Sequence, residues 1–205
     1  MNDGYISVLD SISSDSPTPG GGTVAALTLS HAHSLAEMVA RLTIGKNKWS
    51  TGQEIAEKII SYCTDARGKS LMLAKEDSDA FTEVMSAYRL SKSNLDEIEL
   101  RKNAILSATI GAASTPLSIA IEGHKLLLQL PELGLHGNSN AITDLAAASE
   151  LAYTSVYIAY LNVKINVDSL KDPELDEIQE KAEEILSESK ILIHDIRLIV
   201  SNRME

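Results

Sequence analysis

The apolar positions of this chain recur with helical spacing. Between Thr23 and Ile44 neither Pro nor Gly occurs. One stripe in this stretch repeats every three or four residues: Val24, Leu27, His31, Leu35, Met38 and Leu42. The other side carries small apolar residues: Ala25, Ala32, Ala36, Val39 and Ala40. A helix that is apolar nearly all round is typical of the middle of a bundle, so we expect this helix to be central.

Capping signals predict further helices on both sides of it. A short amphipathic helix is expected over residues 5–12, and Ser50 with Gln53 predicts the start of a long helix that ends near 88–90. Asn94 with Glu97 opens the next helix, in which Pro116 predicts a kink or a restart.

The C-terminal third of the chain follows the same pattern. Residues 131–137 are expected to form a loop, and Asn138 or Thr143 to cap a helix that reaches about Val167. Asp172 followed by Pro173 predicts the start of a last amphipathic helix. No segment alternates with period two. We therefore predict a single all-α domain over residues 1–205, a bundle of five to six long helices.

Composition supports this fold class and limits the functions. Aromatic residues make up 4% of the chain, and 11 Gly and 5 Pro are too few for the frequent turns of an all-β protein. The formal net charge of -11 argues against nucleic-acid binding. The start lacks a signal-peptide pattern, and Glu150 and Asn162 interrupt the least charged stretch. We expect a cytoplasmic protein with no membrane or nucleic-acid partner.

Three adjacent glycines, Gly20, Gly21 and Gly22, are the most informative local feature. They open the central helix, where bare N–H groups can receive an anion or a carbonyl oxygen. A tight turn packed against another helix explains them equally well. A dinucleotide fingerprint is excluded because no strand precedes the turn.

Charged and amide side chains give further candidates. Arg41, Lys46 and Lys48 form a local positive cluster, either a solvated loop or a docking site for a small polyanion. Asp77 lies among the acids of the long helix, and Asp144 lies near a helix start, where it can also serve the helix dipole. Asn162 and Asn166 share one face, where a structural role is favoured. His31, on the apolar stripe, is expected to be a core histidine, and no metal site is expected.

Seven segments together resemble the cyclodeaminase/cyclohydrolase family, the C-terminal domain of formiminotransferase-cyclodeaminase. In chain order they are Ser16-Pro-Thr-Pro-Gly-Gly-Gly-Thr-Val-Ala-Ala26, Met38-Val-Ala-Arg-Leu-Thr-Ile-Gly-Lys46, Glu76-Asp-Ser-Asp-Ala-Phe81, Arg101-Lys-Asn-Ala-Ile105, Thr115-Pro-Leu117, Gly137-Asn-Ser-Asn-Ala-Ile-Thr-Asp144 and Asn162-Val-Lys-Ile-Asn166. The resemblance covers about Ile6 to Asp172. Each motif alone is weak, and their order makes the resemblance specific.

The resemblance implies an all-helical homodimer or higher homo-oligomer that acts on one-carbon units of tetrahydrofolate. Either 5,10-methenyltetrahydrofolate is interconverted with 10-formyltetrahydrofolate, or it is formed from 5-formiminotetrahydrofolate with release of ammonia. The folate derivative is then the substrate, and no tightly bound cofactor is expected. Because no formiminotransferase domain is fused, the first reaction is slightly favoured.

The resemblance also suggests roles for individual residues. Asp77 or Asp144 would be the catalytic acid and base, and the remaining candidates would bind substrate: Gly20, Gly21, Gly22, Arg41, Lys46, Lys48, Asn138, Asn162 and Asn166. One departure matters, because Lys75 stands where the family often has an aspartate. The alternative is therefore a helical folate-binding or scaffold protein with altered or lost catalysis.

Overall fold

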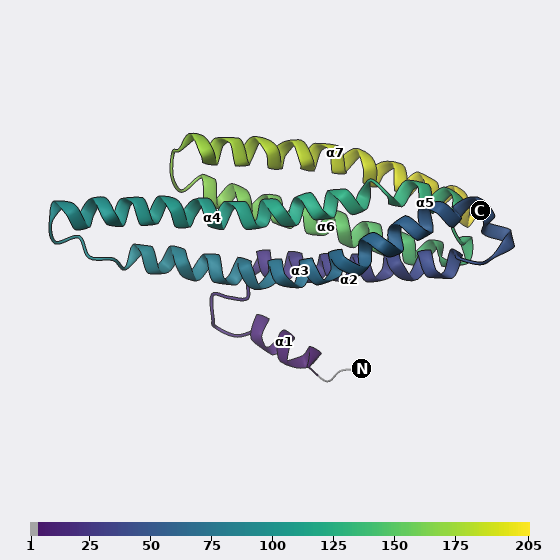
Figure 1. Cartoon of the computed structure of the whole chain (residues 1–205), viewed down its shortest axis with the longest axis horizontal. Coiled ribbons are helices and arrows are strands. Elements are labelled where there is room, and N and C mark those ends of the chain that lie inside the picture. Colours follow the sequence, from purple (N-terminus) through teal and green to yellow (C-terminus); the bar gives the residue numbers. More distant parts are fainter. Residues whose placement is uncertain (1–3) are drawn as a thin grey trace.

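The structure is a computed structural model that describes residues 4–205. Five long helices run side by side in an elongated bundle (Figure 1): α2 (Gly21–Thr43), α3 (Gln53–Tyr88), α4 (Leu95–Leu127), α6 (Ile142–Val167) and α7 (Pro173–Met204). Two shorter helices, α1 (Tyr5–Ile12) and α5 (Leu130–His136), complete the described chain, in which no strand occurs. The predicted all-α bundle is confirmed.

Helix starts were predicted well where a side chain supplies the cap. Asn94 accepts the Glu97 N–H at 2.9 Å, and Asp172 accepts the Glu174 N–H at 3.0 Å. Ser50 was a wrong cap, since it lies in a short 3-10 helix, Asn47–Gly52, that precedes α3. The Gln53 side chain instead binds the backbone of the turn, at Thr43, Gly45 and Trp49.

Two predictions based on proline were wrong. Residues 131–136 lie in a helix and not in a loop, because Pro131 occupies the first turn of α5, where its missing N–H costs nothing. Pro116 does not restart a helix, since α4 continues through it. A proline at this position leaves the Ala112 carbonyl without its helical donor, and Asn166 of α6 donates to that carbonyl at 2.7 Å.

Only one side of α2 is central, which corrects the expectation that the whole helix is buried. Its small residues pack against α3 and α6, and the alanines from Ala25 to Ala40 are fully buried. On the opposite side His31 is exposed, and Met38 and Leu42 are 37% and 44% exposed. The core histidine is His33, two residues further on, which is fully buried and contacts Ser70 Oγ at 3.2 Å through Nδ1.

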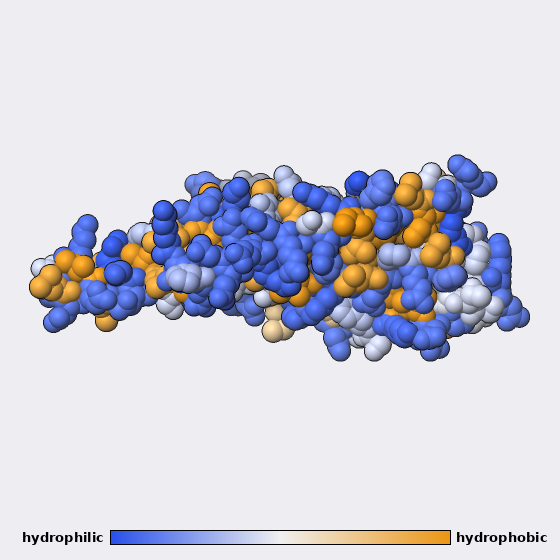
Figure 2. Space-filling view, turned by 90° about the horizontal axis from the view of Figure 1, so that it is seen from above, coloured by the Kyte–Doolittle hydropathy of each residue, from blue (hydrophilic) through white to orange (hydrophobic). Residues whose placement is uncertain are grey.

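Apolar surface also occurs at one tip of the molecule. Figure 2 shows hydrophobic residues at the narrow end, where α3 ends and α4 begins, and Leu95 there is 83% exposed. By length and composition alone, one segment, Leu95–His136, would be able to cross a membrane. Its α4 portion packs against α3, α6 and α7, which accounts for its apolar character within the bundle.

Candidate functional site

The glycine turn and Asp77 form one site, at the N-terminal end of α2. Thr23 donates its hydroxyl to Asp77 Oδ2 at 3.0 Å and lies 3.0 Å from Ser78 Oγ. A Cβ on Gly22 would lie 2.2 Å from Asp77 Oδ1, which no real side chain can tolerate. Only glycine at position 22 leaves room for the Asp77 carboxylate, which contacts the backbone of the first turn of α2.

Two opposing effects act on the Asp77 carboxyl, which is half-buried. Burial raises its pKa above the usual aspartate value, and hydrogen bonds from Thr23 act against this rise. The N-terminus of α2 also favours a negative charge at this point. A half-buried carboxyl with a raised pKa is suited to accept and return a proton.

The α6 amides border the same site. The Asn162 side-chain nitrogen lies 3.6 Å from where a Cβ of Gly21 would be. Asn162 donates to Ile158 O at 2.9 Å and therefore has a fixed orientation beside the turn. Asn166, one turn further along, donates to Ala112 O and Asn162 O. Its amide joins α4 to α6, so Asn166 supports the site and its nitrogen is not free for a ligand.

The other candidates lie at the opposite end of α2. Asn138 donates from its side chain to Leu42 O at 2.9 Å and from its backbone to Thr43 Oγ1 at 3.0 Å, so it holds the C-terminus of α2. Asp144 follows in the first turn of α6 and is half-buried. Asp144 and the positive cluster thus share one end of the bundle.

Within the positive cluster the three cations differ. Arg41 is bound to the buried Glu37, with Nη2 at 2.6 Å from Oε1. Lys48 lies over the Trp49 ring, with Nζ at 4.5 Å from its centroid. Lys46 is exposed, and among residues 4–205 no ion pair involves it. Lys46 is therefore the cation most available to an anionic ligand.

The structure thus separates the candidates into two groups. The first holds Gly20, Gly21, Gly22, Asp77, Asn162 and Asn166; the second holds Arg41, Lys46, Lys48, Asn138 and Asp144. The helical rise over α2 places the glycine turn about 33 Å from the C-terminal end of that helix, and Asp144 lies about 27 Å along α6 from Asn162. Asp77 and Asp144 of one chain therefore cannot act on the same reacting atom.

Lys75 lies away from the glycine turn. Its side chain is 78% exposed and is bound to Asp79, one turn along α3. Residues 75 and 77 point roughly 200° apart on a helix, so Lys75 faces away from the Gly22 contact. The replacement of a family aspartate at 75 leaves the geometry around Asp77 intact.

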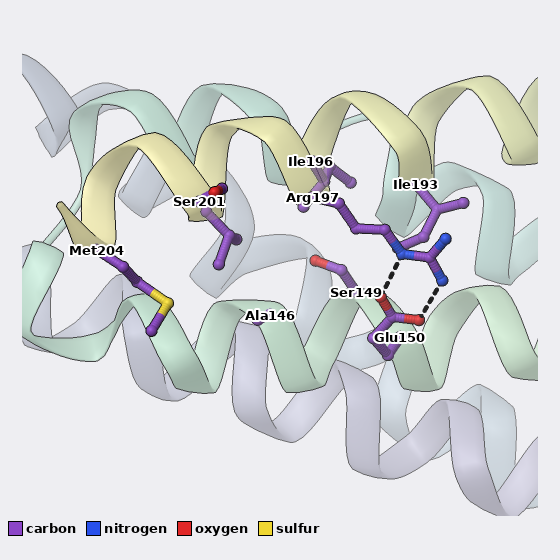
Figure 3. A pocket seen from close by; sticks show the side chains of 9 residues that line it. Ala146, Ser149, Glu150, Ile193, Ile196, Arg197, Ser201 and Met204 are labelled. Atoms are coloured by element: carbon purple, nitrogen blue, oxygen red, sulfur yellow. Dashed lines mark hydrogen bonds and ion pairs between the residues drawn. The ribbon is translucent and has the colours of Figure 1, made fainter.

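Two other hollows lie outside the first group of candidates. A groove of about 770 Å³ separates α1 from the exposed side of α2. A smaller pocket of about 310 Å³ lies between α6 and α7, and Figure 3 shows the Glu150–Arg197 ion pair across it, at 2.7 Å. The candidate catalytic carboxylates line neither of them.

The fold and the candidate site together define a class of protein, all-helical and with a half-buried carboxylate in contact with a glycine turn. Comparison with known proteins makes this specific, because residues 5–184 match the profile of formiminotransferase-cyclodeaminase. The chain belongs to this family.

Individual relatives agree with this assignment. The chain is 32% identical to methenyltetrahydrofolate cyclohydrolase of Methylorubrum extorquens, over 80% of this chain and 79% of that protein. It is 30% identical to formimidoyltransferase-cyclodeaminase of Gallus gallus, over 85% of this chain, and spans 32% of that longer protein. A solved structure of formiminotetrahydrofolate cyclodeaminase from Thermotoga maritima superposes with a TM-score of 0.80 at 29% identity, covering 96% and 92% of the two chains.

The sequence offered Asp77 as a candidate but not the residues that contact it. Thr23 and Ser78 contact the site and were not among the candidates, although both lie within the quoted motifs. Their contact joins positions 54 and 55 residues apart, so no local spacing could have indicated it. The glycines were the available signal, because their missing side chains imply that another group approaches the backbone.

Proposed function

We propose that this chain is a folate one-carbon enzyme that works on the carbon between N5 and N10 of tetrahydrofolate, with Asp77 as its acid and base. The observation that supports this most directly is the contact between Asp77 and the bare backbone of Gly22. A flat pterin ring can approach a glycine turn closely, and its reacting carbon then comes within reach of the carboxylate.

The proposed reaction is the hydrolytic one. Water adds to the methenyl carbon as Asp77 accepts its proton, giving a tetrahedral carbon bonded to both nitrogens. The bond to N5 then breaks, N5 receives a proton from Asp77, and 10-formyltetrahydrofolate leaves with net release of one proton. The free-standing cyclohydrolase of Methylorubrum extorquens, nearly four-fifths of which this chain covers, supports this reaction.

The second candidate is the cyclodeaminase reaction, which the Thermotoga maritima structure favours. Here N10 attacks the formimino carbon and gives its proton to Asp77. The same carboxyl protonates the departing ammonia, and 5,10-methenyltetrahydrofolate is formed. Both reactions pass through a tetrahedral carbon and use the same proton carrier, so one site serves either.

Asp77→Asn tests the role of this carboxyl. Loss of general acid–base catalysis is expected to lower kcat by about 10²- to 10⁴-fold. Purified protein is assayed by the absorbance of 5,10-methenyltetrahydrofolate, followed as it is consumed or formed from 5-formiminotetrahydrofolate. The matched control is Asp79→Asn, on the same helix but exposed and bound to Lys75, which is expected to keep its activity.

Thermal stability separates catalysis from folding in this test. Because burial raises the pKa of Asp77, its ionised form costs the folded state free energy at pH 7. Asp77→Asn is therefore expected to keep or raise Tm. Wild-type protein that binds both folates without converting either would contradict the enzyme and favour the folate-binding alternative.

A further inference from the structure

Two hydroxyl groups join the Asp77 carboxylate in a chain of three polar side chains. Thr23 Oγ1 lies 3.0 Å from Asp77 Oδ2 and, on its other side, 3.0 Å from Ser78 Oγ. Thr23 is buried, and Asp77 and Ser78 are half-buried. The proposed function uses only the carboxylate, so it leaves the two hydroxyls without a role.

The number of protons fixes the direction of the two hydrogen bonds. An ionised carboxylate can only accept, so Thr23 donates its single hydroxyl proton to Asp77 Oδ2. Thr23 then has no proton left for Ser78, and Ser78 must be the donor in the second bond. A proton on Asp77 Oδ2 makes the carboxyl a donor, and both bonds can then reverse. The protonation of Asp77 is therefore coupled to the orientation of both hydroxyls.

Ser78 does not make the bond that is usual for a hydroxyl within a helix of this protein. Ser34 and Ser86, for example, each donate to the carbonyl one turn earlier in their own helix, at 2.8 Å. Ser78 has the Ala74 carbonyl in that position, but its hydroxyl contacts Thr23 of another helix. Within residues 4–205 this hydroxyl makes no other hydrogen bond. It can therefore exchange a proton with water.

We propose that Thr23 is a positioning residue for Asp77, and that Thr23 and Ser78 form a hydroxyl relay that carries the proton of Asp77 to solvent during turnover. The proposal rests on the proposed function, in which the hydrolytic reaction releases one net proton. A pterin ring bound on the glycine turn would cover Asp77. The proton then needs a route that does not pass through the ligand, and Ser78 provides it.

The hydroxyl relay moves one proton and leaves no charge on either hydroxyl. Asp77 gives its proton from Oδ2 to Thr23 Oγ1, the Thr23 proton moves to Ser78 Oγ, and the Ser78 proton moves to water. Each hydroxyl loses one proton for the one that it gains, and Asp77 returns to its carboxylate. Rotation of both hydroxyls restores their first orientation. In the cyclodeaminase reaction Asp77 gives its proton to the departing ammonia, so only hydrolysis depends on the relay.

Thr23 is the polar group with the strongest hold on the pKa of Asp77. Burial raises this pKa, and the Thr23 hydroxyl and backbone N–H both lower it. The titratable side chains of the surrounding elements are Glu76 and Asp79 of α3, Tyr157, Tyr160 and Lys164 of α6, and Asp15 of the connection before Gly20. Residues 21–30 of α2 and 103–121 of α4 contain none. The pKa of Asp77 therefore reports on its bond from Thr23.

Titration of Asp77 tests the positioning role without any assay of activity. Thr23→Val removes the hydroxyl and nearly keeps the shape of the side chain, so the pKa of Asp77 is expected to rise further. Thr23→Ser keeps a hydroxyl and is expected to leave this pKa close to that in wild type. NMR of the labelled carboxyl carbon, assigned by its absence in Asp77→Asn, measures the pKa. Thr28→Val, the same substitution in the α2 groove, is the matched control.

Steady-state kinetics tests the hydroxyl relay. Ser78→Ala keeps the bond from Thr23 to Asp77 but interrupts the relay, so kcat for hydrolysis is expected to fall about 10-fold, with KM changed less than about twofold. Imidazole, a small proton acceptor, is expected to restore part of the lost rate. Ser86→Ala, in the same helix, removes a hydroxyl that bonds only within α3 and is expected to keep its activity. Thermal unfolding of each variant shows whether the fold is retained.

The outcomes separate this proposal from the proposed function. An unchanged pKa of Asp77 in Thr23→Val would overturn the positioning role. Wild-type kcat for hydrolysis in Ser78→Ala, or a loss that imidazole does not restore, would overturn the relay. Wild type that converts neither folate would contradict the proposed function, while the titration of Asp77 would still decide whether Thr23 holds the carboxylate.

Discussion

At the scale of single residues, the contact between Gly22 and Asp77 sets the geometry of the site. A Cβ at position 22 would lie 2.2 Å from Oδ1 and 2.7 Å from Cγ of Asp77, so the carboxylate would have to move and lose its bond from Thr23. Gly22→Ala is therefore expected to lower kcat at least about 10-fold, and its overpacking to destabilise the fold by about 1–3 kcal/mol.

Gly68→Ala is the control for this prediction. Nothing lies within 4 Å of a Cβ at position 68, in the same helix as Asp77. The higher helix propensity of Ala is expected to stabilise this variant by about 1 kcal/mol and to leave activity unchanged. Urea unfolding measures the change in stability of each variant, and the folate assay measures its change in activity. Equal effects of the two substitutions would show that the carboxylate does not need a bare backbone.

At the scale of helices, the bond from Asn166 to Ala112 O explains how α4 continues through Pro116. The sequence contains Pro116 and Asn166 as parts of separate motifs, and neither motif indicates that they act on one carbonyl. Asn166→Ala is expected to cost about 1–3 kcal/mol, because it leaves that buried oxygen without a donor. In a Pro116→Ala background the new N–H at 116 can bond to Ala112 O, and the cost is expected to be smaller.

A double-mutant cycle measures this coupling by urea unfolding of wild type, both single variants and the double variant. Comparing the loss caused by Asn166→Ala in the two backgrounds cancels the change in helix propensity and packing at position 116. A coupling of at least about 0.5 kcal/mol is expected. Strictly additive losses would mean that Asn166 acts elsewhere.

At the scale of the whole molecule, local sequence patterns predicted where the helices begin better than they predicted which helix faces are buried. Asn94 and Asp172 cap helices because a cap depends on residues two or three apart. The position of α2 was not predictable in this way, because an apolar stripe from Val24 to Leu42 does not show by itself whether it faces the core or the surface. The same holds for Asp77 and Asp144, whose separation depends on helices that pack from distant parts of the chain.

The buried ring of His33 is expected to make the stability of the fold depend on pH. Burial lowers the pKa of His33 to about 4 from 6.5, although the charge of Glu122 acts in the opposite direction. Its ring contacts Ser70 through Nδ1 and the edge of Tyr62, and Nε2 has no partner. A proton on Nε2 would therefore be buried without a hydrogen-bond acceptor, and the charge of Glu122 offsets only part of that cost.

The sign of the effect follows from these pKa values. Between pH 6.5 and about 4 the unfolded chain binds a proton at His33 that the folded chain does not, so stability falls as the pH falls. The full loss is on the order of 3 kcal/mol. Burial also lowers the pKa of His124 and adds a loss of the same sign. The lowered pKa of Glu122 matters mainly near and below its ordinary value of 4.5. The raised pKa of Asp77 acts with the opposite sign, because protonation relieves the cost of its buried charge. Comparison with a His33 variant therefore isolates the contribution of the histidine.

Urea unfolding at a series of pH values from 7 to 4.5 measures this dependence. His33→Gln is expected to start less stable at pH 7, because it disturbs a buried contact with Ser70, but to lose less stability on acidification. The difference in slope should approach about 1.4 kcal/mol per pH unit at the middle of the window. His194→Gln, exposed on α7, controls for the loss of a histidine. Parallel slopes for wild type and His33→Gln would show that His33 gains its proton in the folded protein, which would require the core around Tyr62 to admit water.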